Sequence, residues 1–238
     1  MTQFTNYSDV IFDAFCLHSK RNDIVARKQE ILDKINEYYN AAHGSILFVG
    51  FNPAILSTTA KEIFVAEISD RVYDWLIGQG VKINRFVEPR KFDCVVAFDE
   101  YLTFATSEEE QQSLIKGLCR LSCGSVITTV KDYKNQEFKD REYSQPAMIR
   151  NGNQLTAFTE IHDRSHQDKN AWVTSTYQLS GPVSECRGVY QRRALYFKQL
   201  AKFSADAGST NFLVHKNIMY KSLIKKNYEH VISISFDS

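Results

Sequence analysis

The 238-residue sequence lacks the features of several classes of protein. Its formal net charge is only +1, so the overall charge does not favour DNA, RNA or an anionic membrane as a partner. No segment approaches the roughly 20 apolar residues of a membrane span, and residues 1–20 have no apolar core of signal-peptide length. Repeats and low-complexity tracts are also missing. We therefore expect a protein that does not enter a membrane.

Cysteine is scarce and forms no framework. The five cysteines are an odd set without regular spacing, which favours reduced thiols and a cytoplasmic location. Cys119 and Cys123 are four residues apart on a predicted helix, but no second pair completes a zinc site. We interpret them as packing residues and expect no metal.

The composition is that of a globular protein. Hydrophobic residues make up 43% of the chain and charged residues 24%. The length fits one large α/β domain or two small ones, and it can bury a full core without disulfides or metals.

Short apolar runs alternate with helical patterns from residue 45 onward. The run at 92–98 is almost continuously apolar, as expected for a strand buried on both faces. Ser69 and Ser107 are good N-caps, and Glu110 completes a capping box with Ser107. Such alternation predicts a parallel sheet with right-handed crossovers. The predicted strands are 46–49, 62–68, 81–86, 92–98 and 124–130, and the predicted helices are 70–78 and 107–121, with a weak helical link at 52–60.

The two flanking regions have other patterns. Helical spacing at 7–18 and 21–43 predicts an N-terminal helical extension over residues 1–44, which would cover the cofactor or substrate site. Beyond residue 132 the alternation stops, and antiparallel hairpins are predicted at about 147–180, with a turn at Asn151-Gly152-Asn153. These hairpins would either wall an acceptor pocket or form a homodimer interface. A loop at 163–170, a helix at about 186–206 and strands at 212–220 and 230–236 complete the prediction.

A glycine turn and an acid indicate the ligand. The apolar run at 46–49 ends at Gly50, and Glu67 follows the next apolar run. Glycine lets the backbone approach a ligand, and a carboxylate accepts hydrogen bonds from ribose hydroxyls. The spacing favours a nucleoside-binding crevice.

Several motifs in this order resemble the class I S-adenosylmethionine-dependent methyltransferases. Ile46-Leu47-Phe48-Val49-Gly50 looks like the first motif of that family, with Phe51-Asn52-Pro53 in place of its later glycines. Ala66-Glu67-Ile68-Ser69 looks like the acidic second motif, and the segment 92–104 looks like the fourth strand with its active-site loop. The segment 215–220 resembles the penultimate strand.

The resemblance implies an α/β, Rossmann-like fold over residues 45–238. That fold has a mostly parallel seven-stranded sheet with helices on both faces, here with the hairpin insertion after the fifth strand. It also implies S-adenosylmethionine as cofactor, with Glu67 on the ribose, Ile68 beside the adenine, and Gly50 and Phe51 along the methionine moiety. The full implied cofactor set is Gly50, Phe51, Asn52, Pro53, Glu67, Ile68, Phe98, Asp99 and Glu100.

Methyl transfer mainly requires alignment, and a general base is needed only if the acceptor carries a proton. The candidates follow the fourth and fifth strands, where this fold places its site. They are Asp99, Tyr101, Asp132 and Tyr133, any of which could orient or deprotonate an acceptor. The histidines of His162-Asp163-Arg164-Ser165-His166 suggest a metal site, but no third ligand can be placed, and we interpret this segment as a solvated turn.

The sequence thus predicts a methyltransferase that acts on a small-molecule acceptor. The absence of an Asn-Pro-Pro-Tyr or Asp-Pro-Pro-Tyr signature after the fourth strand argues against methylation of nucleic-acid bases. Two alternatives stay open: a methyltransferase acting on protein or RNA, and a methyltransferase-like binding protein that has lost turnover.

Overall fold

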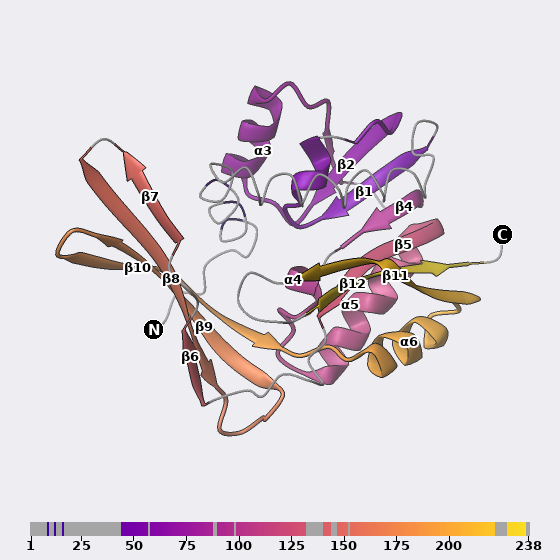
Figure 1. Cartoon of the computed structure of the whole chain (residues 1–238). Helices are drawn as coiled ribbons and strands as arrows, with labels where there is room; N and C mark the ends of the chain where they lie inside the picture. Colours follow the sequence, from indigo (N-terminus) through magenta and orange to yellow (C-terminus); the bar gives the residue numbers. More distant parts are fainter. Residues whose placement is uncertain are drawn as a thin grey trace.

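The structure is a computed structural model, and it contains two β-sheets (Figure 1). It describes Asp9, Phe12, Cys16 and residues 44–56, 58–87, 90–97, 99–131, 140–143, 147–151, 153–221 and 228–236. Asp9, Phe12 and Cys16 are helical, in agreement with the helix predicted at 7–18. The helix predicted at 21–43 lies outside the described residues.

The larger sheet has seven strands in the order β11-β12-β5-β4-β1-β2-β3. The five neighbouring strands β5, β4, β1, β2 and β3 are parallel to one another. β12 is antiparallel to both of its neighbours, β5 and β11. The sequence prediction of a mostly parallel seven-stranded sheet is confirmed. The strands are β1 (Ser45–Val49), β2 (Glu62–Ala66), β3 (Asn84–Arg85), β4 (Phe92–Val96), β5 (Ser122–Lys131), β11 (Asn211–Lys221) and β12 (Tyr228–Ser235).

The edge strand β3 is shorter than the strand predicted at 81–86. Only Asn84 and Arg85 pair with β2. The backbone N–H of Val81 instead donates to the carbonyl of Leu76, at the end of the preceding helix. The residues before Asn84 therefore close that helix before the chain enters the sheet.

The predicted helices at 70–78 and 107–121 are present and capped as expected. Ser69 accepts a hydrogen bond from the backbone of Val72, and Ser107 accepts one from Glu110. The Glu110 carboxylate accepts from the backbone N–H of Thr106, one residue before the N-cap. The helices are η2 (Pro53–Leu56), α3 (Asp70–Gly78), α4 (Asp99–Leu102), α5 (Glu108–Leu121) and α6 (Phe197–Asp206).

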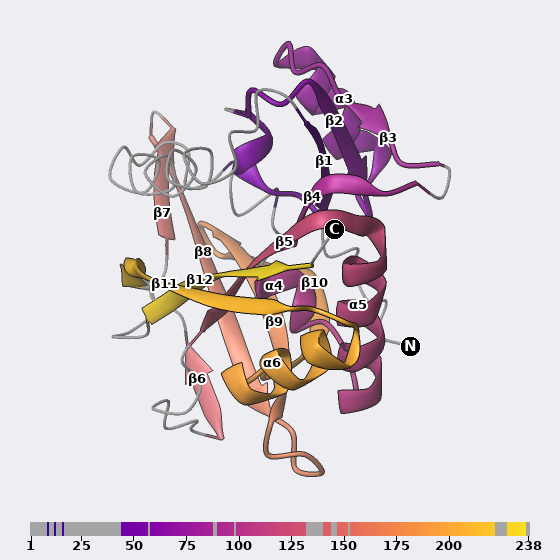
Figure 2. The ribbon, with the colours of Figure 1, turned by 90° about the vertical axis from the view of Figure 1, so that its right-hand side faces the viewer.

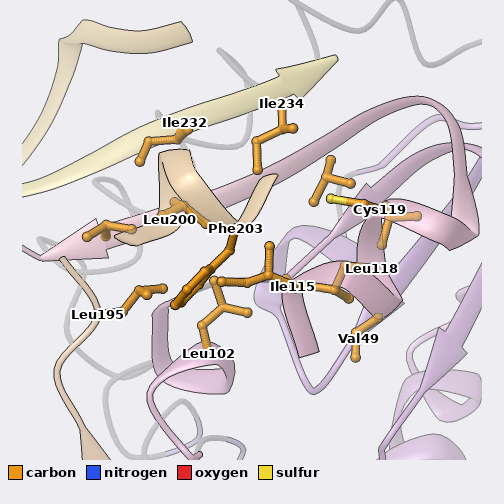
Figure 3. Close-up of a cluster of buried hydrophobic side chains, with 14 of the residues drawn as sticks. Val49, Leu102, Ile115, Leu118, Cys119, Leu195, Leu200, Phe203, Ile232 and Ile234 are labelled. Carbon is orange, nitrogen blue, oxygen red and sulfur yellow. The ribbon is translucent and has the colours of Figure 1, made fainter. Parts of the chain in front are cut away.

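Alternate side chains of the central strands enter two different cores. Ile46 and Phe48 pack with Val72 and Leu76 of α3 on one face of the sheet. The intervening β1 residues pack on the other face with α4, α5 and α6, where Phe203 is central (Figure 3). Figure 2 shows α3 on one side of the sheet and α5 and α6 on the other. Helices thus cover both faces, as the near-continuous apolar strands predict. None of the helices in the described ranges is long and apolar enough to cross a bilayer.

The second sheet occupies the chain between β5 and α6. It is antiparallel, with the order β10-β9-β8-β6 and with β7 paired to β8. Antiparallel strands were predicted within this region, at about 147–180. The strands are β6 (Arg141–Tyr143), β7 (Ala147–Asn151), β8 (Gln154–Arg164), β9 (Ala171–Ser180) and β10 (Val183–Arg193).

The helix predicted from residue 186 is wrong over its first part. Residues 183–193 form β10, which pairs with β9 from Val183 to Arg193 with one register shift between Cys186 and Gly188. The apolar residues that suggested the helix were Leu195, Leu200 and Phe203, and they lie in or just before α6. The preceding residues carry no helical apolar stripe, so pairing with β9 decides their conformation.

Two glycines should respond in opposite ways to the same substitution. A β-carbon at Gly124 would lie 2.5 Å from the backbone oxygen of Asp93, so Gly124→Ala should destabilise the protein by about 1–3 kcal/mol. Gly117 lies within α5 with open space around it, so Gly117→Ala should stabilise the protein by about 0.5–1 kcal/mol. Urea unfolding of both variants measures the two free energies. Changes of the same sign would contradict the packing described for Gly124.

Candidate functional site

The predicted glycine turn joins the ends of two neighbouring strands. Gly50 directly follows β1 and has a φ of 76°, in the left-handed region that glycine adopts without strain. Its N–H donates to the carbonyl of Ala66, the last residue of β2, at 3.0 Å. The turn therefore holds the carboxyl ends of β1 and β2 together.

The residues after the glycine are packing residues. The Phe51 ring is buried and makes edge contacts with Phe12 at 5.3 Å and Trp75 at 6.3 Å between ring centroids. Asn52 is also buried, and its backbone carbonyl accepts a hydrogen bond from the backbone N–H of Ile55 as η2 begins at Pro53. The ring of Phe51 is thus occupied in the core, which leaves its backbone to line a ligand.

Glu67 has an unusual backbone at the tip of β2. Its φ is 56°, and its side chain is exposed. A residue with a β-carbon in this conformation is strained by about 1–2 kcal/mol, and such strain is concentrated at functional sites. Next to it, Ile68 is buried in the core beneath α3. Because Gly50 is bonded to Ala66, the acid and the glycine turn are neighbours at one edge of the sheet.

Tyr101 lies on α4, after β4, and belongs to the same edge. Burial, together with the negative charge of Glu67, raises the pKa of its phenol to about 12. At neutral pH the phenol is protonated, as an ordinary tyrosine is, and the raised pKa keeps it a hydrogen-bond donor into more alkaline solution. Of the two roles predicted for Tyr101, orientation of an acceptor agrees with this pKa, and deprotonation does not.

The other candidate residues lie partly or wholly outside the described part of the chain. Asp99 and Glu100 form the first turn of α4, so their backbone follows β4 as the motif predicts, but their side chains lie outside the described part. Phe98, Asp132 and Tyr133 also lie outside the described residues.

The second sheet is fixed to the loop after α4. The buried guanidinium of Arg192 donates to the Thr103 hydroxyl at 3.0 and 2.7 Å, and the Arg193 N–H donates to the Thr103 carbonyl at 2.7 Å. The Tyr190 ring stacks on Phe104 at 5.0 Å. We call this contact the Thr103–Arg192 junction. In Figure 1 the second sheet stands at the side of the main sheet where α4 lies.

The junction defines the inner face of the second sheet. Register places Thr174 opposite both His162 and Tyr190, and Trp172 opposite Arg192, so these side chains share one face. We call this the inner face; it also carries Glu160, two residues before His162. The inner face is polar where it approaches the loop after α4.

The interpretation of 162–166 as a solvated turn is wrong for its first histidine. His162 is in β8 on the inner face, with 17% of its side-chain surface exposed. Asp163 points to the opposite face, where it pairs with Arg141, and His166 is exposed in the turn after β8. Across the described ranges, no group of three or more potential metal ligands is present.

Solved structures resemble this chain over nearly its full length. A sugar N-methyltransferase, KedS8 from Streptoalloteichus sp., matches with a TM-score of 0.68 and 11% identity over 95% of this chain and 93% of its own. An S-adenosylmethionine-dependent methyltransferase from Clostridium acetobutylicum matches with a TM-score of 0.65 and 11% identity over 98% and 100%. The chain has the class I methyltransferase fold. No protein-family model and no curated protein sequence matches it.

A third match is CalS10, an amino pentose methyltransferase from Micromonospora echinaspora. Its TM-score is 0.63, with 11% identity over 98% of each chain. At sequence identities this low, the similarity establishes the fold only. The chemistry of the site depends on this chain's own residues.

The candidate site lies where the methyltransferase fold reverses its strand order. From β1 the sheet continues to β2 and β3 on one side and to β4 and β5 on the other. Ligands of open α/β sheets bind outside the carboxyl ends of the strands at such a point. Gly50, Glu67 and Tyr101 follow β1, β2 and β4 respectively, so the predicted residues meet at this edge.

The Thr103–Arg192 junction should contribute measurably to stability. Thr103→Val keeps the shape of the side chain but removes the acceptor of a buried guanidinium, so we expect a loss of about 1–3 kcal/mol in the free energy of unfolding. Thr103→Ser keeps the hydroxyl and should lose much less. Denaturant unfolding compares the two variants; equal losses would show that the methyl group, rather than the hydrogen bonds, stabilises the junction.

The raised pKa of Tyr101 predicts its behaviour in alkali. The difference in phenolate absorbance between the wild type and Tyr101→Phe should titrate near pH 12, and Glu67→Gln should lower that midpoint. Because the unfolded chain ionises Tyr101 near its ordinary value of 10, its stabilising effect is complete below that pH and is lost as the pH rises through 12. A midpoint at the ordinary value would show that Tyr101 is solvated.

Proposed function

We propose that this protein is an S-adenosylmethionine-dependent methyltransferase that acts on a small-molecule acceptor. The main support for the proposal is that Gly50 and Glu67 lie side by side at the edge where the strand order of the sheet reverses. Gly50 has a left-handed backbone conformation and is hydrogen-bonded to the end of β2. Because it has no side chain, a ligand can approach the backbone there. Beside it, Glu67 presents an exposed carboxylate that would accept hydrogen bonds from ribose hydroxyls.

The residues of this edge fit the cofactor, although the motif has only one glycine. The turn keeps its form through the hydrogen bond from Gly50 to Ala66, and the Phe51 ring is turned into the core. In our proposal Gly50 and the backbone of Phe51 to Pro53 hold the methionine moiety. Glu67 holds the ribose, and Ile68 supports the adenine from below. Phe98, Asp99 and Glu100 complete the predicted set.

The acceptor would lie between this edge and the inner face of the second sheet. The phenol of Tyr101 would orient it by donating a hydrogen bond, and Asp99, Asp132 and Tyr133 stay candidates for the same task. The hydroxyl-bearing inner face suits a polar acceptor, which agrees with the sugar N-methyltransferase and amino pentose methyltransferase among the similar structures. Bound S-adenosylmethionine would supply the methyl group.

The organisation of the protein follows from the same proposal. Residues 45–238 would form the methyltransferase-like domain, with the hairpins inserted at about 147–180 and residues 1–44 as the helical extension. All five cysteines are free thiols, which suits the cytoplasm. The outer face of the second sheet exposes Tyr143, Met148 and Leu155, and a homodimer would form there.

Calorimetry of the demethylated cofactor tests the proposal. The wild type should bind S-adenosylhomocysteine, and Glu67→Ala should abolish detectable binding because the ribose hydroxyls lose their acceptor. Glu62→Ala is the matched control: Glu62 begins the same strand, at the opposite edge of the sheet, and should leave the affinity within twofold. Absence of binding to the wild type, or equal loss in both variants, would refute the proposed site.

A further inference from the structure

The inner face carries a connected group of titratable side chains outside the predicted site. The His162 Nδ1 lies 2.9 Å from the Thr174 hydroxyl, and the His162 Nε2 lies 3.6 Å from a carboxylate oxygen of Glu160. The Tyr190 hydroxyl is 3.3 Å from the other oxygen of that carboxylate. Three strands, β8, β9 and β10, thus supply one cluster.

The cluster is placed toward the proposed acceptor. Tyr190 stacks on Phe104, and its neighbour on the inner face, Arg192, is held by Thr103. Both contacts are to the loop that follows α4, which carries Tyr101. The second sheet therefore presents His162 and Glu160 on the face that meets the carboxyl edge of the main sheet. The 17% of the His162 side chain that is exposed leaves it accessible to a ligand.

The geometry defines which nitrogen can act. With its hydrogen on Nδ1, His162 donates to the Thr174 oxygen and keeps the lone pair of Nε2 for a proton. Once protonated, Nε2 lies within ion-pair distance of Glu160, whose carboxylate is itself held by Tyr190. A carboxylate this close to an imidazole stabilises its charged form, which favours transfer of a proton to Nε2.

We propose that His162, oriented by Thr174 and Glu160, is the general base that removes the proton of the methyl acceptor. This inference rests on the proposed methyltransferase function. An ammonium nitrogen has no lone pair until its proton leaves, and a hydroxyl oxygen is only a weak nucleophile until it loses its proton. In the step, the acceptor proton moves to Nε2 of His162, the acceptor lone pair forms the bond to the methyl carbon, and the electrons of the carbon–sulfur bond pass to the sulfonium sulfur, which becomes a neutral thioether.

Several charged groups share the inner face with His162 and act on its protonation through their charge. Both Arg164 and Arg192 are engaged: Arg164 donates to the Lys169 carbonyl, and Arg192 donates to Thr103. β9 contributes only uncharged neighbours, Thr174 and Thr176. The titratable or charged residues that face His162 from the described strands are Glu160 and Arg164 on β8, Glu142 on β6, and Tyr190 and Arg192 on β10.

The first test measures methyl transfer. Labelled S-adenosylmethionine is incubated with the small-molecule fraction of a cell extract from pH 5.5 to 9, and the label transferred is counted. His162→Gln should lower transfer by about 100-fold or more, the usual contribution of a general base, while binding of S-adenosylhomocysteine changes less than twofold. His166→Gln, in the exposed turn after β8, is the matched control and should transfer at the wild-type rate.

The second test needs no acceptor. In protein labelled at the histidine ring carbons, the resonance that disappears in His162→Gln reports the titration of His162 by NMR. Glu160→Gln should lower that midpoint by at least half a pH unit, because the imidazolium loses its carboxylate, whereas the exposed Glu185→Gln should not. The acid limb of the transfer profile should shift in the same direction.

The outcomes separate the two proposals. If the wild type fails to bind S-adenosylhomocysteine, the methyltransferase function is refuted, and the base with it. If the wild type binds the cofactor and transfers label but His162→Gln keeps at least a third of the transfer, only the base is refuted. An unchanged His162 titration in Glu160→Gln also overturns the pairing, whatever the acceptor.

Discussion

β1 is buried along its whole length, and the arrangement of the site depends on this burial. A strand with apolar side chains on both faces must be covered twice, so α3 packs on one face and α4, α5 and α6 on the other. β2 and β4 flank β1 in parallel, and their carboxyl ends therefore meet at one edge. Gly50, Glu67 and Tyr101 come together for this reason. The strained backbone of Glu67 lies at the same edge, supported by the pairing of β1 with β2.

The Thr103–Arg192 junction is the second constraint. A buried guanidinium must be hydrogen-bonded, and Thr103 supplies an acceptor from the loop after α4. Gln111, fully buried on α5, reinforces the contact by donating to the carbonyls of Arg193 and Ala194. These bonds fix the second sheet with its polar inner face toward the main sheet. The chemistry proposed here is shared between the two sheets for that reason: one presents the cofactor groups and the other presents the base.

Local signals in the sequence predicted much of the fold. Apolar runs located β1, β2, β4 and β5, and the caps at Ser69 and Ser107 located α3 and α5, because strand burial and capping act over a few residues. The prediction was wrong where pairing partners are distant. β10 was predicted as helix because its conformation depends on β9, and His162 was interpreted as a turn residue because its partner Thr174 lies on another strand.

The sequence by itself determined the order of strands and helices from β1 to β5, the glycine turn and the acid that follows β2, since each rests on the periodicity or spacing of nearby residues. Only the tertiary structure decided that the Phe51 ring packs in the core, that burial raises the pKa of Tyr101, and that His162 contacts Thr174 of β9. Burial and charge at those positions come from segments far apart in the chain. No local pattern records such contacts, because they arise only when distant segments of the chain pack together.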